Sequence, residues 1–311
     1  MSAIARYYKT KGYPVAGYDR TPSDLTRQLE REGINVHYTD NPDYIPKDVA
    51  STLVVYTPAV PDDLGEMVYV REHGYTIVKR SRMLGELSSG QTCLAVAGTH
   101  GKTTTSTLIA HIITESGSGC SAFLGGISKN YGTNLLVSQT PVFVAEADEY
   151  DRSFLQLHPA VAVITAMDAD HLDIYGTHEE YRKAFKAFAS QVSRCVIIKK
   201  GLDITPADTK AKILTYCYDD PTADYHASGA RPDNLGHYIF DLVYPGGVIK
   251  DVRCGVPGWV NVENSVAAAA VCLAQGLPSE SVKASIGTFA GVMRRLDVHV
   301  ASPSLTYIDA Y

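Results

Sequence analysis

A glycine-rich turn between an apolar run and a helix-like stretch constrains this chain more than any other feature. The apolar run covers residues 93–97, the helix-like stretch covers 106–114, and between them lies Gly98-Thr99-His100-Gly101-Lys102-Thr103-Thr104-Thr105. Such a strand–turn–helix unit aims backbone N–H groups and a helix N-terminus at one point, where Lys102 adds a mobile, solvent-facing cation. The expected ligand is the polyphosphate of ATP or GTP, with the Thr103 hydroxyl on the accompanying Mg²⁺.

The turn departs at one position from the general phosphate-loop pattern G-x-x-x-x-G-K-[ST]. Val96 stands where the first glycine of that pattern belongs. The alternative interpretation is a surface turn rich in glycine and threonine. The strand before the turn and the helix after it favour the phosphate loop.

Apolar runs alternate with helix-like stretches along the first part of the chain. Strands are expected at 15–18, 34–38, 52–56 and 76–79, and helices at 2–11, 23–32 and 64–73. Strands separated by helices indicate a parallel, doubly wound sheet, so we expect a Rossmann-like α/β domain over residues 1–88. The strand and glycine turn that normally open such a sheet do not precede Met1, and we expect them to lie outside this chain. The polar segment 85–90 is the expected link to the second domain.

The second domain, expected over residues 89–301, is again α/β and contains the phosphate loop. Strands are expected at 141–146, 160–166 and 195–199, and helices at 178–191, 262–274 and 279–288. Short strand-like runs at 236–243 and 247–254 predict an antiparallel extension of the sheet. With 311 residues the chain exceeds the usual size of one domain, and two domains are expected, followed by a short segment at 302–311.

Composition excludes several classes of function. A net charge of -6 and a pI near 5.9 argue against nucleic acid or an anionic membrane as the main partner. The six cysteines are dispersed, without a C-x-x-C pair or zinc-ligand spacing, which indicates reduced thiols. No apolar stretch reaches the roughly 20 residues that a membrane-spanning helix needs. We therefore expect a cytoplasmic protein with small-molecule ligands, and the sequence predicts no particular oligomeric state.

Acidic residues follow two of the expected strands. Residues 146–151 read Glu-Ala-Asp-Glu-Tyr-Asp, and residues 168–173 read Asp-Ala-Asp-His-Leu-Asp. Ligand sites in open α/β sheets gather at the carboxyl ends of strands, so these two loops are expected to converge on the nucleotide phosphates and on Mg²⁺. The alternatives are a solvated acidic loop for the first segment and a structural histidine at His171.

These motifs together resemble the Mur ligase superfamily. The matching segments are Gly98 to Thr105, Glu146 to Asp151 with Ser153-Phe154, Asp170-His171, and the pair Asn261 and Asn264. The resemblance implies that ATP is bound by a loop formed by Gly98, Thr99, His100, Gly101, Lys102, Thr103 and Thr104. It also implies that Thr103, Glu146 and His171 bind Mg²⁺, and that Lys102 and His171 take part in catalysis.

Two further site predictions come from the same resemblance. Asn261 and Asn264 are expected to approach the adenine; the alternatives are a helix N-cap at Asn261 and a surface position for Asn264. The family often has histidine where this chain has Val260. One guanidinium of the pair Arg294-Arg295 is expected to hold a phosphate or an acyl phosphate, and we assign this catalytic role to Arg295.

The motifs resemble most closely the branch of the family that joins L-alanine to UDP-N-acetylmuramate. This implies ATP-dependent amide formation through an acyl phosphate, in cytoplasmic peptidoglycan precursor synthesis, with the UDP-sugar bound by the first domain. The alternatives are a murein-peptide recycling ligase and a nucleotide-binding fragment without ligase activity. In the family a third, C-terminal domain follows a hinge that corresponds to residues 302–311. We therefore expect this chain to bind ATP–Mg²⁺ but to be inactive alone.

Overall fold

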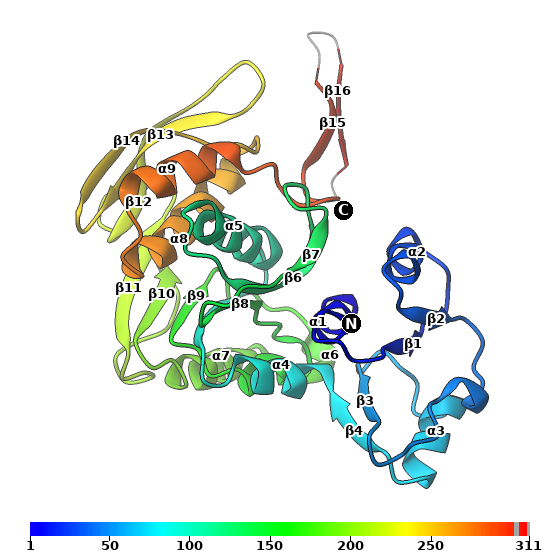
Figure 1. Ribbon diagram of the computed structural model, residues 1–311. Helices are drawn as coiled ribbons and strands as arrows, with labels where there is room; N and C mark the ends of the chain where they lie inside the picture. The colour runs from blue at the N-terminus through cyan, green and yellow to red at the C-terminus, as the bar shows by residue number, and fades with distance from the viewer. Residues whose placement is uncertain (302–304, 310–311) are drawn as a thin grey trace. The chain divides into compact units, whose positions relative to one another are not determined.

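The computed structural model describes residues 1–301 and 305–309. Contacts divide the chain into two compact units, Met1–Leu87 and Ser88–Tyr311 (Figure 1). Among the helices of these described residues, none is long and apolar enough to cross a membrane.

The first unit alternates helices and short strands, as the sequence predicts. Its elements are α1 (Ser2–Thr10), β1 (Ala16–Tyr18), α2 (Asp24–Arg31), β2 (Asn35–His37), η1 (Pro42–Tyr44), β3 (Leu53–Tyr56), α3 (Gly65–Glu72), β4 (Thr76–Lys79) and α4 (Arg80–Ser88). The strands form two separate parallel pairs, β1 with β2 and β3 with β4, rather than one sheet. Each strand has only three or four residues, so each pair forms a short ladder of backbone hydrogen bonds.

Local sequence determines where helix α2 begins. The Ser23 hydroxyl accepts a hydrogen bond from the Thr26 backbone N–H, and the Thr26 hydroxyl oxygen accepts one from the Ser23 N–H. This reciprocal cap satisfies two backbone donors that a helix start otherwise leaves unpaired. The small core of this unit gathers Ile45, Met67, Val70 and Tyr75.

The expected link at 85–90 contains the boundary between the two units, which falls after Leu87, but it is mainly helix rather than a polar break. Residues 85–88 belong to helix α4, and only Ser89 and Gly90 form a turn before the next strand. Met83 and Leu84 are buried together with Ser88, four to five residues further on, which is the spacing of one helix face. Burial along that face outweighs the modest helix penalty of the single glycine at 85.

The second unit is built on a mixed sheet with the strand order β14-β13-β12-β11-β10-β9-β5-β8-β6-β7. The strands are β5 (Thr92–Ala97), β6 (Ser121–Ser128), β7 (Thr133–Leu136), β8 (Val142–Glu146), β9 (Val161–Ile164), β10 (Cys195–Lys199), β11 (Lys212–Cys217), β12 (Tyr225–Pro232), β13 (Tyr238–Tyr244) and β14 (Gly247–Arg253). Strands from β6 to β12 run parallel through the centre of the sheet, and β13, β14 and β7 are antiparallel to their neighbours. The predicted antiparallel extension is therefore present, whereas β6 and β7 were not predicted.

Helices cover both faces of this sheet (Figure 1). Helices α5 (Lys102–Glu115), α8 (Trp259–Ala274) and α9 (Ser279–Thr288) lie on one side, and α7 (His178–Ser190) lies on the other. The short elements η2 (Tyr150–Gln156) and α6 (Leu172–Tyr175) follow β8 and β9. Because both faces are covered, the central strands are continuous apolar runs, such as the fully buried β9.

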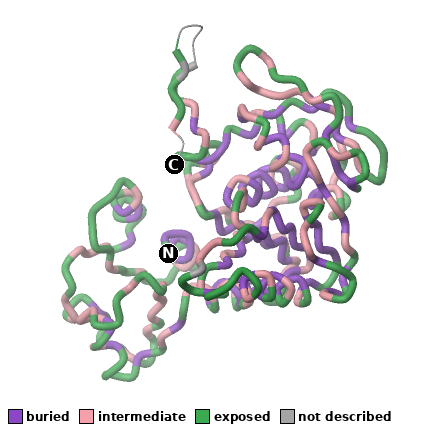
Figure 2. Tube along the Cα trace, turned by 180° about the vertical axis from the view of Figure 1, so that it is seen from behind, coloured by how far each residue is buried: buried purple, intermediate pink, exposed green. Residues whose placement is uncertain are grey.

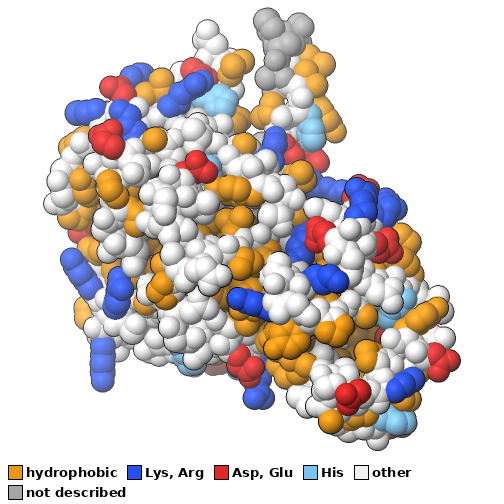
Figure 3. Space-filling model, viewed as in Figure 1, with side chains coloured by type: hydrophobic (Ala, Val, Ile, Leu, Met, Phe, Trp, Pro, Cys, Tyr) orange, Lys and Arg blue, Asp and Glu red, His pale blue; other side chains and the backbone are white. Residues whose placement is uncertain are grey.

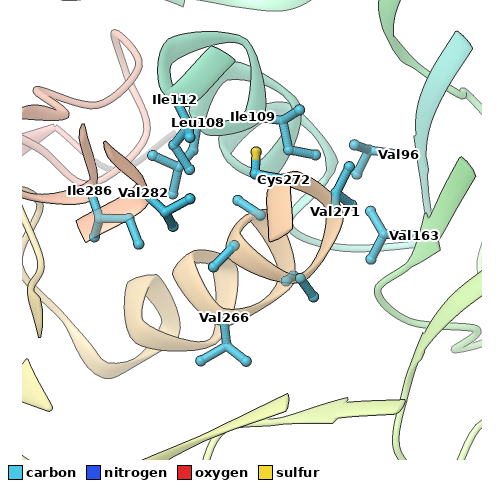
Figure 4. Packing of buried hydrophobic residues seen from close by; sticks show 14 of the residues in the cluster. Val96, Leu108, Ile109, Ile112, Val163, Val266, Val271, Cys272, Val282 and Ile286 are labelled. Carbon is cyan, nitrogen blue, oxygen red and sulfur yellow. The ribbon is translucent and has the colours of Figure 1, made fainter. Parts of the chain in front are cut away.

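The core of the second unit is concentrated between α5, α8 and the sheet, as Figure 2 shows in purple. Four consecutive alanines of α8, at 267–270, are completely buried. Small side chains let α8 approach its neighbours closely. Figure 4 shows Ile109 and Ile112 of α5, Val271 and Cys272 of α8, and Val282 and Ile286 of α9 meeting at one centre. Such packing leaves α5 and α8 little freedom to shift against each other.

A two-stranded antiparallel hairpin follows the last helix. It pairs β15 (Asp297–Ala301) with β16 (Thr306–Asp309), and it carries exposed apolar side chains (Figure 3). The buried Asp297 carboxylate accepts a 2.6 Å hydrogen bond from Lys129 Nζ. Burial alone would raise the pKa of Asp297, but this bond and the Arg294 backbone N–H hold that pKa below its usual range. The predicted hinge at 302–311 thus includes β16, and its residues 302–304 and 310–311 lie outside the described residues.

A buried histidine on α5 makes the stability of the second unit dependent on pH. The His111 ring nitrogens lie 2.9 Å from the Tyr131 hydroxyl and 3.0 Å from the Thr288 hydroxyl. Burial lowers the pKa of His111 from its ordinary 6.5, although Glu115 opposes the shift. A lowered pKa favours the neutral ring, so its contribution to stability is complete above pH 6.5 and is lost as pH falls through the lower, folded-state pKa.

We expect His111→Gln to lose this pH dependence. Urea unfolding of the wild type and the variant, measured between pH 5 and pH 8, should differ most in free energy of unfolding at the alkaline end. The difference should shrink as pH falls below the ordinary histidine pKa. An equal difference at every pH would show that the titration of His111 is not linked to folding.

Candidate nucleotide-binding site

The glycine turn lies between β5 and α5, and two of its glycines meet conditions that no other residue type satisfies. Gly98 has a φ of 131°, and an added Cβ would overlap the Thr165 hydroxyl and lie 2.7 Å from the Ala166 backbone nitrogen. Gly101 has a φ of 80° and is the N-cap of α5; a Cβ there would lie 2.8 Å from Asn264 Oδ1. The sequence alone indicated glycine at these positions for backbone access to a phosphate.

Hydrogen bonds from neighbouring strands hold the turn in place. The Thr165 hydroxyl, just after β9, lies against the carbonyl oxygens of Ala97 and His100. The Thr99 hydroxyl donates to the Asp168 carbonyl at 3.1 Å. The turn is therefore fixed to the segment that contains His171, as expected from the adjacency of β5 and β9.

Lys102 is paired with a buried carboxylate, which corrects the expectation that it faces solvent freely. Its Nζ lies 2.8 Å from Oε1 and 2.7 Å from Oε2 of Glu149. The Glu149 side chain is 1% exposed and that of Lys102 is 13% exposed. His171 Nε2 lies 4.0 Å from the same Glu149 Oε1. The structure thus brings Lys102 and His171 together through Glu149.

Glu149 was not among the predicted site residues. The only signal in the sequence was its place in the acidic run 146–151, which holds four carboxylates that spacing cannot rank. Which of the four carboxylates reaches Lys102 depends on the backbone of the turn after Glu149, where Asp151 and Arg152 have φ values of 46° and 61°. Positive φ at two successive residues other than glycine is unusual and turns the chain sharply after Glu149.

Glu146 and Thr103 lie close to two adjacent glycines of β6, Gly125 and Gly126. An added Cβ at Gly125 would overlap the Glu146 carboxylate, and one at Gly126 would lie 3.2 Å from Thr103 Cγ2. Two of the predicted Mg²⁺ ligands thus approach neighbouring residues of β6, Glu146 at Gly125 and the Thr103 methyl group at Gly126. The third, His171, lies 4.0 Å from Glu149 Oε1, and binding of one ion by all three stays a prediction.

These residues fit Mg²⁺ only together with phosphate oxygens. Within residues 1–301 and 305–309 the structure contains no group of three or more histidine, cysteine, aspartate or glutamate side chains placed to hold a metal ion. Mg²⁺ is commonly bound through one or two carboxylates plus the oxygens of a nucleotide, so the Thr103 hydroxyl and the Glu146 carboxylate are a suitable donor set.

The asparagine pair lies beside the phosphate loop rather than in its alternative positions. Helix α8 begins at Trp259 with Gly258 as its N-cap, so Asn261 is inside the helix and Asn264 is one turn further on. Asn261 Nδ2 donates to the Pro257 carbonyl at 2.7 Å, and its Oδ1 accepts from Asn264 Nδ2 at 3.2 Å. The Asn264 amide oxygen accepts in turn from Thr105 Oγ1 at 3.3 Å.

A small pocket adjoins the asparagine pair. It is lined by Thr104 and Leu108 of α5, by Asn261, Asn264 and Ser265 of α8, and by Gly255, Val256 and Phe289 among others. Polar amides therefore meet apolar side chains next to the turn that carries Lys102.

The arginine pair lies at the end of β6 that carries the glycine pair. Val292 bridges to Ser128, and an added Cβ at Gly126 would lie 2.6 Å from a methyl group of Val292. Arg295 follows three residues later with an exposed side chain, and its backbone N–H donates to the Val292 carbonyl. Arg295 is thus on a segment that packs beside Thr103 and Glu146, and its predicted contact with phosphate stays a prediction.

The second unit is a doubly wound sheet that carries a phosphate loop. A buried carboxylate contacts the lysine of this loop, and an asparagine pair lies beside the loop. These features define a nucleotide-binding α/β protein. Residues 96–272 match the family described as Mur ligase middle domain, and residues 1–92 match the Mur ligase family, catalytic domain. The chain belongs to the Mur ligase family, which confirms both the resemblance and the fold class predicted from the sequence.

Curated relatives cover this chain from end to end. It is 48% identical to a UDP-N-acetylmuramate–L-alanine ligase of Phocaeicola vulgatus over 317 aligned positions, which include 100% of this chain and 69% of the relative. It is 47% identical to the enzyme of the same name from Porphyromonas gingivalis, across 100% of this chain and 70% of that one.

Solved structures agree with the fold. The UDP-N-acetylmuramate–alanine ligase of Thermotoga maritima matches with a TM-score of 0.88 at 27% identity, covering 100% of this chain and 71% of that one. A ligase named for UDP-N-acetylmuramate and the peptide L-alanyl-γ-D-glutamyl-meso-diaminopimelate, from Neisseria meningitides, matches with a TM-score of 0.83. Its identity is 22% over 94% of this chain and 96% of that one, which supports the fold alone.

Proposed function

We propose that this chain provides the ATP-binding domain, and part of the sugar-binding domain, of a ligase that joins L-alanine to UDP-N-acetylmuramate. The observation that carries the proposal is its 48% identity, along its whole length, to relatives named for that reaction. The chain spans about 69% of the length of such a relative. We place the reaction in the cytoplasm, where ATP and Mg²⁺ are available and where peptidoglycan precursors would be made.

The chemistry requires activation of a carboxylate. A carboxylate is a poor electrophile because attack on it would expel oxide, so an oxygen of the lactyl carboxylate first takes the γ-phosphoryl group of ATP and ADP leaves. The nitrogen of L-alanine then attacks the carbonyl carbon, inorganic phosphate leaves, and the nitrogen loses a proton. Charge accumulates on the phosphoryl oxygens in the first step, where a fixed cation is most effective.

We assign each part of this reaction to particular residues of the site. Lys102 would leave Glu149 and bind the phosphate oxygens, supported by the backbone of the loop 98–104. Thr103, Glu146 and His171 would hold Mg²⁺, which neutralises phosphate charge when it is bound. Asn261 and Asn264 would orient the adenine, and Arg295 would hold the transferred phosphoryl group.

Calorimetric titration distinguishes the proposal from its alternatives. The 311-residue chain should bind ATP–Mg²⁺ and UDP-N-acetylmuramate, and should release no heat with the tripeptide L-alanyl-γ-D-glutamyl-diaminopimelate. Binding of the tripeptide would favour a murein-peptide ligase instead. Absence of ATP–Mg²⁺ binding would contradict the assignment of the nucleotide site.

Replacing a proposed metal ligand should raise the Mg²⁺ requirement for ATP binding. Glu146→Gln and His171→Ala each leave phosphate charge less neutralised, and we expect the Mg²⁺ concentration at half-saturation to rise about tenfold or more. Glu179→Gln is the matched control, because this exposed carboxylate on α7 pairs with Lys183 at the surface. If both site variants titrate with Mg²⁺ as the wild type does, these residues are not ligands.

A further inference from the structure

Two buried tyrosines beyond β9 lie behind the nucleotide site, and nothing in the motifs assigns them a role. Tyr175, the last residue of α6, is 4% exposed, and Tyr181, in the first turns of α7, is 0% exposed. Their rings meet edge to face with centroids 4.9 Å apart. Each hydroxyl reaches a different loop of the site.

Tyr175 holds the loop that carries Glu149. Its hydroxyl donates a hydrogen bond to the Glu149 backbone carbonyl, while the Glu149 carboxylate binds Lys102. The Arg152 guanidinium lies over the Tyr175 ring, 5.4 Å from its centroid. Tyr175 therefore contacts Glu149, which precedes the sharp turn, and Arg152, which is one of the two residues whose positive φ forms it.

Tyr181 holds the phosphate loop itself. Its hydroxyl lies 3.0 Å from the Thr99 hydroxyl, which donates its own proton to the Asp168 carbonyl. Because Thr99 has a single hydroxyl proton, Tyr181 is the donor in their contact. The Thr99 side chain is thus fixed from two directions.

Both hydroxyl groups remain protonated donors at neutral pH. Burial raises the pKa of Tyr175 to about 12, and it raises the pKa of Tyr181 as well. The two bonds are therefore neutral hydrogen bonds in a buried setting, and each is expected to contribute about 0.5–1.5 kcal/mol.

We propose that Tyr175 and Tyr181 are positioning residues that together fix Glu149 and Thr99, and through them the lysine and backbone that receive the nucleotide phosphates. This inference rests on the proposed nucleotide-binding function. Tyr175 acts through Glu149, the partner of Lys102, and Tyr181 acts through Thr99 of the phosphate loop. Removing one hydroxyl should loosen one loop while the aromatic packing stays in place.

Tyr175→Phe and Tyr181→Phe test the inference, with Tyr225→Phe as the control. Tyr225 is also buried, and its hydroxyl pKa is likewise raised to about 12 by burial, but it lies on β12, separated from β9 by β10 and β11. Calorimetry should give a Kd for ATP–Mg²⁺ about threefold to tenfold weaker in each site variant, the range expected for one lost hydrogen bond. The control should bind as the wild type does.

The thermal shift produced by nucleotide separates positioning from a purely structural role. A structural role would lower the unfolding temperature equally with and without ATP–Mg²⁺, whereas loss of positioning should also shrink the shift that nucleotide produces. Unchanged Kd and unchanged nucleotide-induced shift in both site variants would overturn the inference.

Amide hydrogen exchange without nucleotide tests the same inference independently of the proposed function. Tyr175→Phe should speed exchange at residues 149–154, and Tyr181→Phe should speed it at 99–101, with no change at either segment in Tyr225→Phe. If the wild type fails to bind ATP–Mg²⁺ but the two site variants still exchange faster than it does, the anchoring of the two loops is supported and the nucleotide site is contradicted. Unchanged exchange in both site variants would contradict the anchoring itself.

Discussion

Lys102→Ala should both abolish measurable ATP–Mg²⁺ binding and lower the free energy of unfolding by about 3–5 kcal/mol. The first effect follows from loss of the cation that faces the phosphates. The second follows from the pairing seen in the structure, because the substitution leaves the buried Glu149 carboxylate without its 2.7 Å partner. Urea unfolding and calorimetry on the same sample measure the two effects.

A double substitution separates these two consequences. Lys102→Met with Glu149→Gln removes both charges and keeps similar side-chain volumes, so we expect stability close to that of the wild type. ATP–Mg²⁺ binding should remain absent, since the cation is still missing. A Lys102→Ala protein that unfolds at the same urea concentration as the wild type would contradict the importance of the ion pair for stability.

Gly98→Ala should strongly destabilise the second unit. The added Cβ would overlap the Thr165 hydroxyl and crowd the backbone of Thr165 and Ala166, at a φ of 131° that alanine rarely adopts. Overpacking against backbone and strain in φ each contribute roughly 1–3 kcal/mol, so we expect a loss of about 4 kcal/mol or more. Circular dichroism during thermal unfolding measures it.

Gly117→Ala is the matched control for this prediction. Gly117 also has a positive φ, of 81°, but no atom lies within 4 Å of an added Cβ. Its substitution should therefore report backbone strain alone, of about 1 kcal/mol. Similar losses for the two variants would mean that the close approach to Thr165 has no energetic consequence.

Local sequence signals predicted most of the elements around the site. Helix α9 and strand β10 have the bounds expected from periodicity, and α5 follows the glycine turn as expected. Strand β6 was missed because a pair of adjacent glycines, Gly125 and Gly126, is typical of a turn. Here the pair has a tertiary cause, since Glu146 and Val292 occupy the space that side chains would fill.

The site itself was predictable only where a motif specifies it. The turn from Gly98 to Lys102 is a local pattern, so its position was evident from the chain. The selection of Glu149 among four carboxylates depends on backbone angles at Asp151 and Arg152, and the contribution of Tyr175 depends on how two loops meet. Contacts between loops that are distant in the sequence leave no periodic pattern from which they could be predicted.

The alanines at 267–270 have a consequence for how this site can change over evolution. They hold α8 tightly against its neighbours, so Asn264 and Gly101 form a wall that tolerates few substitutions. The loop after Glu149 is held by single contacts instead, such as those of Tyr175 with the Glu149 carbonyl and the Arg152 guanidinium. Mutations that alter affinity for nucleotides or inhibitors while sparing the fold should therefore accumulate around residues 150–153, and compounds that contact only Asn264 and Gly101 should meet resistance more rarely.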